Sequence, residues 1–503
     1  MTPAGGGPLD AEHRRLLLWV GRAVPRFLKY CEMEGIEVRA ISRMELADLA
    51  PYARALAIEV RGDDHEFADW VPPVIALGLD HGLAVGLLLA DDHDDDVPEL
   101  REPDLLRYFE QVKAVPRDLH RVPALYGDTF KMMRWARDCA PGPGANRQLV
   151  FREPIADPTN SLLLQRAFHD FDAVTVKPLG EGMSQARVWQ VWPEKAADLR
   201  PAVSFVAKID TRSRIEAERS NARRIGQVVG VRRHAPIDRA RSVDGYEQGL
   251  VVYHMMERAE PFRTAVIRNP ASVVADLFAH TLCGLYAGRT PAEHRMSDVC
   301  RDLGLLRESA ALDAAARDSG TGIDPSVAIQ SLESLAPVIA QCGMIHGDPH
   351  AGNLFVAGGP EVVLIDYGSV RYASPVVADA ACLEVSLAFP AGQGDHRDPA
   401  VYHSPAVLEW LAAAYAPPLR APAPPRPGAP ASWLAEAIEH VRGYVKQLEP
   451  NPVVYSVLIA ANLLRHASYL DNGTAISRAL AYRLAITLVT DAVATHGLTT
   501  LPA

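Results

Sequence analysis

Two short apolar runs, 354–356 and 362–365, flank a Gly-Gly-Pro turn in the second half of the chain. Apolar runs of this length that are joined by turn residues predict a β-hairpin. A polar loop precedes the first run, and Asp366 directly follows the second. The hairpin would therefore bring Asp366 back beside the loop residues Asp348 and Asn353.

Alternating and apolar segments between residues 150 and 258 predict a small sheet accompanied by helices. The expected elements are helices at 161–168 and 215–226 and strands at 174–179, 186–192, 203–210 and 249–256. The last of these strands would lead into a hinge.

The region after the hinge is predicted to be mainly helical. The expected helices are 272–286, 324–342, one that begins at Ser374, and three that close the chain at 432–447, 452–469 and 474–496. A polar segment at about 289–322 and a proline-rich stretch at 417–430 interrupt them. On the second closing helix, Arg465 and His466 are expected to face solvent or a cap.

The first third of the chain is predicted to be a separate domain, because a Pro-Gly-Pro-Gly stretch follows it. Apolar residues at helical spacing predict a helix over 10–33 that is kinked at Pro25. An apolar run at 82–90 predicts a buried strand, and the acidic residues 91–96 after it are interpreted as a solvated turn. Residues 1–145 are thus expected to form an accessory α/β or mostly helical domain, which is the candidate region for protein partners.

The composition describes a soluble globular protein of 503 residues, of which 48% are apolar and 22% charged. A net charge of −11 argues against nucleic-acid binding through bulk electrostatics. The sequence contains no uninterrupted apolar stretch of about eighteen residues, so no membrane span is predicted, and no secretory signal is recognised. The six cysteines form no Cys-x-x-Cys pair and are interpreted as isolated buried thiols. A cytoplasmic location is therefore expected.

The polar loop reads His346-Gly-Asp-x-x-x-x-Asn353, and the second apolar run ends in Ile-Asp366-Tyr-Gly. These motifs resemble the catalytic and metal-binding loops of the protein-kinase-like superfamily, and most closely those of its aminoglycoside and choline phosphotransferase branch. The first loop is also similar to that of the ubiquinone-associated atypical kinases. The segment 379–384 is similar to a bacterial subset, the ternary-complex-associated kinase-like domains.

The resemblance implies a fold and a set of site residues. The fold would be a bilobal α+β arrangement, with an antiparallel-sheet N-lobe at 150–258 and a helical C-lobe at 259–503. Asp348 would be the catalytic base that positions an acceptor hydroxyl, and His346 would brace its loop. Asn353 and Asp366 would hold Mg²⁺, a hard cation that takes oxygen ligands.

The resemblance places ATP against the small sheet. A glycine-rich turn after the strand 174–179 contains Gly180, Gly182 and Ser184, and its backbone N–H groups could approach phosphate oxygens. Gln185 replaces the third glycine of the usual pattern. Met255 and Met256 would lie at the hinge beside the adenine.

Lys208 lies among apolar residues near the end of a predicted strand, so its ammonium needs an anionic partner. The resemblance identifies that partner as ATP phosphates together with a glutamate of the next helix. Glu218 is preferred because it shares a helix face with Ile225, and Glu216 is the alternative. Asp379 has two interpretations, as a brace for the catalytic loop or as an acid in the first turn of a helix.

The expected function is that of an ATP- and Mg²⁺-dependent phosphotransferase acting on a hydroxyl group of an unidentified acceptor. One alternative is a nucleotide-binding pseudokinase that serves as a scaffold in a bacterial signalling or conflict system. Another is a metal hydrolase that would collect His346, Asp348 and His350. The hydrolase is disfavoured because the His-x-His-x-Asp-His pattern of metallo-β-lactamase-type sites is missing from this loop.

Overall fold

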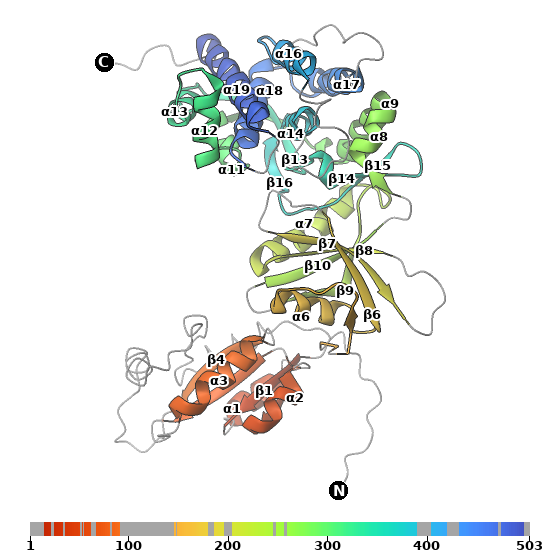
Figure 1. The fold of residues 1–503 in the computed structure, drawn as a ribbon, viewed down its shortest axis with the longest axis vertical. Helices are drawn as coiled ribbons and strands as arrows, with labels where there is room; N and C mark the ends of the chain where they lie inside the picture. The colour runs from red at the N-terminus through yellow and green to blue at the C-terminus, as the bar shows by residue number, and fades with distance from the viewer. Residues whose placement is uncertain are drawn as a thin grey trace, which may run out of the picture. The chain divides into compact units, whose positions relative to one another are not determined.

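The computed structural model divides into two compact units. The residues that it describes are 15–21, 25–33, 36–50, 53, 55–61, 67–80, 83–90, 145–146, 148–179, 186–195, 204–244, 248–255, 259–389, 404–419, 432–470 and 474–496. The first unit comprises residues 1–216 and 237–254, and the second comprises 217–236 and 255–503. The boundary falls inside helix α7 (Arg212–Val228), so this helix contributes to both units (Figure 1).

The described strands of residues 15–90 form a parallel sheet with the order β2-β1-β3-β4. Its strands are β1 (Arg15–Val20), β2 (Ile36–Ile41), β3 (Ala55–Arg61) and β4 (Ala84–Ala90), and its helical segments are α1 (Pro25–Met33), η2 (Arg43–Glu45), α2 (Leu46–Leu49) and α3 (Phe67–Asp80). Leu16 and Leu18 pack with α2 and α3 on one face, whereas Leu17 and Trp19 pack with α1 on the other. Helices cover both faces, which explains why β1 is apolar at consecutive positions.

The helix predicted over 10–33 is therefore wrong in its first half, where β1 lies. Pro25 does not kink a helix but begins α1, a position at which its missing N–H costs nothing. The strand predicted at 82–90 is confirmed as β4. The acidic residues 91–96 and the glycine-proline break at 141–144 lie outside the described residues.

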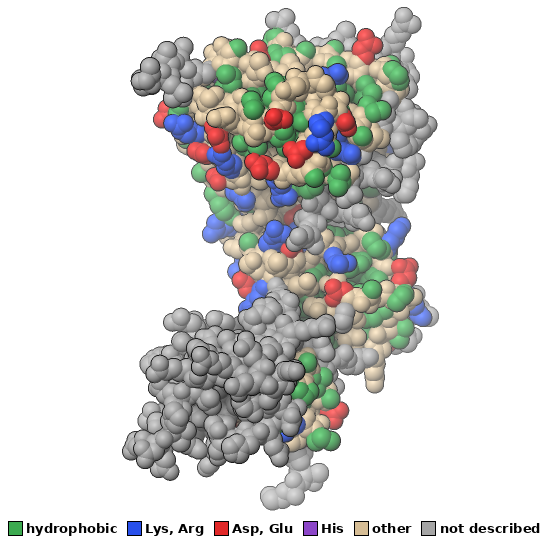
Figure 2. Space-filling view, turned by 60° about the vertical axis from the view of Figure 1, so that its left-hand side comes forward, with side chains coloured by type: hydrophobic (Ala, Val, Ile, Leu, Met, Phe, Trp, Pro, Cys, Tyr) green, Lys and Arg blue, Asp and Glu red, His purple; other side chains and the backbone are tan. Residues whose placement is uncertain are grey.

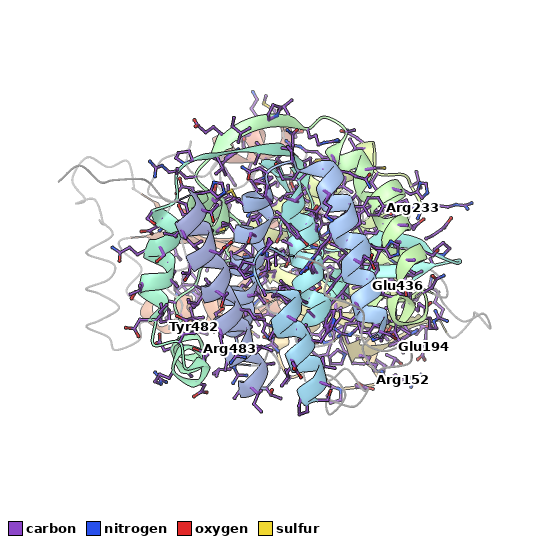
Figure 3. The ribbon with its side chains drawn as sticks, turned by 90° about the horizontal axis from the view of Figure 1, so that it is seen from above. Arg152, Glu194, Arg233, Glu436, Tyr482 and Arg483 are labelled. Atoms are coloured by element: carbon purple, nitrogen blue, oxygen red, sulfur yellow. The ribbon has the colours of Figure 1, made fainter. Side chains whose placement is uncertain are left out.

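A second sheet of the first unit contains six described strands in the order β5-β6-β7-β8-β10-β9. They are β5 (Val150–Phe151), β6 (Ala173–Pro178), β7 (Arg187–Glu194), β8 (Phe205–Thr211), β9 (Ile237–Asp244) and β10 (Gln248–His254). The pairs from β6 to β9 are antiparallel, and β5 joins β6 in parallel. Helix α6 (Pro158–Ala167) packs against β9 and β10. An ion pair of 2.7 Å between Arg152 and Glu194 links the end of β5 to the end of β7 (Figure 3).

The second unit contains two small sheets among its described residues. One joins β11 (Glu260–Pro261), β14 (Leu354–Ala357) and β15 (Glu361–Leu364), and the other joins β12 (Thr290–His294), β13 (Val338–Ile345) and β16 (Arg371–Pro375). The predicted hairpin is confirmed as β14 and β15, which pair antiparallel from Leu354 opposite Leu364 to Ala357 opposite Glu361.

Helices make up most of the second unit (Figure 1). Those described are α8 (Phe262–Arg268), α9 (Pro270–Asp276), the π-helical η5 (Leu277–Leu282), α10 (Cys283–Tyr286), α11 (Met296–Asp302), α12 (Ala310–Ser319), α13 (Pro325–Glu333), η6 (Ala351–Asn353), α14 (Val377–Ala388), α16 (Pro405–Ala414), α17 (Ser432–Leu448), α18 (Pro452–Ala467) and α19 (Ala475–His496). Helix α18 packs against α14 and α19, and α19 packs against α12. Tyr482 on α19 donates a 2.8 Å hydrogen bond to the carbonyl of Ile323 (Figure 3).

The three closing helices are confirmed as α17, α18 and α19. The helix predicted over 324–342 is wrong in its second half, because α13 ends at Glu333 and β13 begins at Val338. Pro337 separates the two, and a proline disfavours helix both at its own position and at the residue before it. The proline-rich stretch 417–430 lies outside the described residues after Leu419.

The protein is thus a mixed α/β protein with several sheets and many helices. On the face shown in Figure 2, the Lys and Arg side chains of the described residues are interspersed with Asp and Glu side chains. None of the described helices has the length and apolar character that a bilayer crossing requires.

Candidate active site

Strand β13 delivers the chain to a polar loop that is held by backbone hydrogen bonds to Asp379. One carboxylate oxygen of Asp379 accepts from the N–H of His346 at 2.9 Å, and the other accepts from the N–H of Gly347 at 2.8 Å. Tyr286 donates its hydroxyl to the same carboxylate at 3.0 Å. Asp379 is completely buried, and its burial raises the pKa of the carboxyl despite the nearby His346 and these donors. Asp379 also lies in the first turn of α14, so both interpretations of this residue are confirmed: it is a first-turn acid, and it braces the loop.

The loop turns at Gly347, where a side chain could not fit. This residue has a φ of +84°, and a Cβ atom would lie 2.1 Å from the carbonyl oxygen of Ser369. The ring of His346 is buried in the same region and lies 3.0 Å from the carbonyl oxygen of Ile365. Because a carbonyl only accepts, Nε2 of His346 carries the proton. His346 therefore links the loop to the end of β15.

Asn353 and Asp366 are neighbours at the open end of the hairpin. The N–H of Ile365 donates to the carbonyl of Asn353 at 3.1 Å, and this pairing places Asp366 one residue beyond it. The side-chain amide nitrogen of Asn353 donates to the carbonyl of Asp348 at 2.9 Å, so its Oδ1 is the atom left for a cation. The structure thus gathers Asp348, Asn353 and Asp366 around one loop and one hairpin.

Asp366 has an unusual backbone conformation. Its φ is +61°, the only positive value among the described residues other than glycine. Such a conformation costs about 1–3 kcal/mol and persists only where the surroundings impose it. The half-buried carboxylate of Asp366 and the amide oxygen of Asn353 provide hard oxygen ligands, and such ligands fit Mg²⁺.

Asp348 contacts an arginine that was expected from the sequence to face solvent or a cap. Nη1 of Arg465 lies 2.8 Å from Oδ1 of Asp348, and Nη2 lies 3.3 Å from Oδ2. The two side chains are only 13% and 18% exposed. Burial opposes ionisation of Asp348, but the attraction of Arg465, followed by that of His350, holds the pKa of the carboxyl well below its usual range. The predicted exposure of Arg465 and His466 is wrong, since His466 is also buried.

His350 and Cys382 complete the surroundings of Asp348. The Sγ of Cys382, on α14, lies 3.5 Å from Oδ1 of Asp348. Burial raises the pKa of the Cys382 thiol well above its usual value, with a further contribution from Asp348. His350 accepts a hydrogen bond at Nδ1 from the N–H of Gly352, and burial lowers the pKa of its imidazole.

The metal-hydrolase alternative does not fit this geometry. One ring nitrogen of each histidine is already engaged by the backbone, Nε2 of His346 by the carbonyl of Ile365 and Nδ1 of His350 by the N–H of Gly352. Within the described part of the chain, no three His, Cys, Asp or Glu side chains are grouped as a metal site.

The residues proposed to contact the nucleotide are only partly described. Lys208 on β8 is 6% exposed, and its register places it between Val188 of β7 and Val251 of β10. Met255 directly follows β10. Gly180, Gly182, Ser184 and Met256 lie outside the described residues.

The two candidate glutamates of α7 differ sharply in their surroundings. Glu216 is half exposed and forms an i,i+4 ion pair of 3.0 Å with Arg212. Glu218 is only 1% exposed and belongs to the second unit. The helix thus turns Glu218, and not Glu216, inward. Its pairing with Lys208 stays a prediction.

The contact between Arg465 and Asp348 was not predicted from the sequence, although a signal was present. Residues 452–464 of α18 are apolar on nearly every side, and a helix of that kind is buried in a protein interior. An arginine at its end is therefore inside the protein and needs an acid.

Comparison with known proteins identifies part of the chain. Residues 309–387 match the ABC1 atypical kinase-like domain, and this segment includes His346, Asp348, Asn353 and Asp366. The segment is protein-kinase-like. The match confirms the superfamily to which the two loop motifs were compared.

No curated protein matches the chain. Solved structures similar to it include a thermostable mutant of the aminoglycoside phosphotransferase APH(4)-Ia, with 12% identity over 63% of this chain and 94% of that one and a TM-score of 0.36. A fructosamine-3-kinase homologue from Haemophilus somnus has 9% identity over 60% and 89% of the two chains, with a TM-score of 0.33. Spectinomycin phosphotransferase APH(9)-Ia in complex with ADP and spectinomycin has 10% identity over 63% and 92%, with a TM-score of 0.31. At these scores nothing about the chemistry of this protein follows from the likeness.

Proposed function

We propose that the protein is an ATP-dependent phosphotransferase that moves the γ-phosphoryl group to an acceptor hydroxyl. The observation that carries the proposal is the convergence of Asp348, Asn353 and Asp366 on one loop and one hairpin, with Asp379 fixing the loop through two backbone N–H groups. Phosphoryl transfer depends mainly on positioning and on charge neutralisation, so a rigid set of few polar groups suffices.

Each described residue has a defined task in this proposal. Asp348 accepts a hydrogen bond from the acceptor hydroxyl and orients its oxygen toward the γ-phosphorus. As the new O–P bond forms, the bond to the β,γ-bridging oxygen breaks, ADP leaves, and the hydroxyl proton passes through this hydrogen bond to solvent. His346 and Asp379 keep the loop in place.

Asn353 and Asp366 are the residues that would hold Mg²⁺, which neutralises phosphate charge when bound. Lys208 would contact the phosphates, and Glu218 would hold Lys208. The turn with Gly180, Gly182 and Ser184 would cover the phosphates, and Met255 and Met256 would border the adenine. These roles rest on the resemblance and on the burial of Lys208 and Glu218.

Substitutions at the two acids test the proposal. We expect D348N to reduce ADP formation from Mg-ATP at least 100-fold while leaving the dissociation constant for Mg-ATP within about threefold, because Asp348 acts on the acceptor. We expect D366N to weaken Mg-ATP binding about tenfold or more. Calorimetric titration and coupled ADP release provide the two measurements. Equal turnover by wild type and D348N would refute the assignment.

A second candidate is a nucleotide-binding scaffold without transferase activity. It is favoured by one observation, that Arg465 engages both carboxylate oxygens of Asp348. A scaffold would show thermal stabilisation by Mg-ATP but no ADP release, with or without added hydroxyl compounds. A transferase would show both thermal stabilisation by Mg-ATP and ADP release.

A further inference from the structure

Helix α18 brings Arg465 to Asp348, and the contact is built rather than incidental. The two terminal nitrogens of the guanidinium contact the two oxygens of the carboxylate at 2.8 and 3.3 Å, a bidentate pairing that restricts both partners. The backbone of Arg465 is fixed as well, because its carbonyl accepts the hydroxyl of Ser468 at 2.8 Å. Helix α18 itself packs against α14 and α19.

The two oxygens of Asp348 are not equivalent in this arrangement. Oδ1 accepts from Nη1 of Arg465 and is also the oxygen approached by Sγ of Cys382. Oδ2 receives only the longer contact from Nη2 of Arg465. A carboxylate oxygen has two lone pairs, so Oδ1 is saturated and Oδ2 retains one.

We infer that Arg465 is a positioning residue for phosphoryl transfer, which with Cys382 saturates Oδ1 of Asp348 and presents Oδ2 to the acceptor hydroxyl. The inference rests on the proposed function and deepens it. Arg465 contacts neither the acceptor nor the nucleotide in this scheme. Its effect passes entirely through the orientation of the Asp348 carboxylate.

This arrangement also explains why an arginine, and not an apolar residue, occupies position 465 of the buried helix α18. A buried ion pair is weak evidence of stabilisation, because removing two charges from water costs about as much as their attraction returns. The neighbouring residues Leu463 and Leu464 are buried, and an apolar residue at 465 would extend the same packing. A role in orienting Asp348 explains why a guanidinium is used there.

The test measures ADP release from Mg-ATP by the full-length protein and five variants. We expect R465M to lower kcat about 100-fold, since a misplaced catalytic group costs a factor of this order, with the KM for ATP within twofold of wild type. R465K should recover activity to within about tenfold of wild type, because an ammonium can still hold one oxygen.

A double-mutant cycle separates positioning from an independent role. If Arg465 acts only through Asp348, adding R465M to D348N should produce no further loss of kcat. The control is Y455F. Tyr455 lies on α18, as Arg465 does, and the substitution removes its 2.6 Å hydrogen bond to Glu384 of α14. It should lower the melting temperature but keep kcat within threefold of wild type.

The outcomes distinguish the two levels of the proposal. Unchanged or raised kcat in R465M, together with an inactive D348N, would overturn the inference and leave the proposed function standing. Multiplicative losses in R465M and D348N would also overturn it. Wild-type protein without ADP release above that of D348N would overturn the proposed function, and the role of Arg465 with it.

Discussion

At the residue scale, the properties of the site come from a few side chains with unusual surroundings. Asp366 holds a positive φ, Asp379 binds two backbone N–H groups while buried, and Asp348 shares its carboxylate with an arginine. The carboxylates of Asp379 and Asp348 are held by donors from a different part of the chain. Short motifs can identify these two acids, but their donors lie tens of residues away.

The pairing of Asp348 with Arg465 predicts a pH-dependent difference in stability. The pKa of Asp348 is depressed in the folded protein, so its contribution to stability is present above the unfolded value of about 3.9 and is lost as the pH falls below it. In R465M the half-buried carboxyl lacks its partner, and protonation there favours folding. The difference in melting temperature between wild type and R465M should therefore be largest near pH 7 and shrink toward pH 3.

The control for this comparison places D348N in both backgrounds. Without a titrating carboxyl at position 348, the difference between the two melting temperatures should not vary with pH. A difference between wild type and R465M that stays constant from pH 7 to pH 3 would contradict the depressed pKa.

At the element scale, α7 and the loop after it are attached to the hairpin that carries Asp366. Residues 233–235 run beside β15, with the N–H of Ala235 donating to the carbonyl of Leu364 at 2.9 Å. On α7, the amide nitrogen of Asn221 donates to the carbonyl of Tyr367 at 2.9 Å, and its oxygen accepts the hydroxyl of Tyr372 at 2.7 Å. One side chain thus ties the helix to the residue that follows Asp366.

Replacement of Asn221 tests this attachment. We expect N221L to weaken Mg-ATP binding about threefold to tenfold, since a hydrogen bond contributes about 0.5–1.5 kcal/mol and here supports the strained backbone at Asp366. Calorimetric titration with Mg-ATP measures the effect. Y372F is the matched control, because it removes only the second hydrogen bond of Asn221 and should change the affinity less than twofold. Equal affinities of N221L and wild type would refute the coupling.

At the scale of the whole molecule, a buried ion pair connects the helices of the second unit. Arg442 on α17 contacts Glu384 on α14 at 2.6 Å, and both side chains are almost completely buried. Tyr455 on α18 donates to Glu384, and Arg442 also donates to the carbonyl of Ala414 at the end of α16. Four helices therefore meet at one buried network.

Loss of one partner of this network should be costly. We expect R442M to reduce the free energy of unfolding by about 3–5 kcal/mol, because it leaves the Glu384 carboxylate buried without its ion-pair partner. Urea unfolding followed by circular dichroism measures the loss. The double variant E384L/R442L should recover most of it, since no charge then stays buried.

An exposed pair supplies the comparison. Arg301 and Glu333 form an ion pair at the surface, with side chains 47% and 41% exposed. R301A should change the free energy of unfolding by less than about 1 kcal/mol. A similar loss in R301A and R442M would show that burial does not determine the contribution of the Arg442 pair.

The sequence by itself determined the elements whose signals are local. The hairpin of β14 and β15, the closing helices and most strands of the six-stranded sheet follow from apolar spacing and turn residues, which act within a few positions. The loop motifs likewise identified the kinase-like segment, because their spacing is local. Local patterns failed where tertiary packing chose between two states, as in β1, whose apolar run suits a helix or a strand covered on both faces.

Only the tertiary structure decided which distant side chains meet the predicted acids. Arg465 is 117 positions from Asp348, Tyr286 is 93 from Asp379, and Asn221 is 146 from Tyr367. Which of these side chains meet depends on how α7, α10 and α18 pack, and packing sums many small contacts over the whole unit. A single sequence records the chemical character of each residue, but the neighbours that set its charge and orientation exist only in the folded protein.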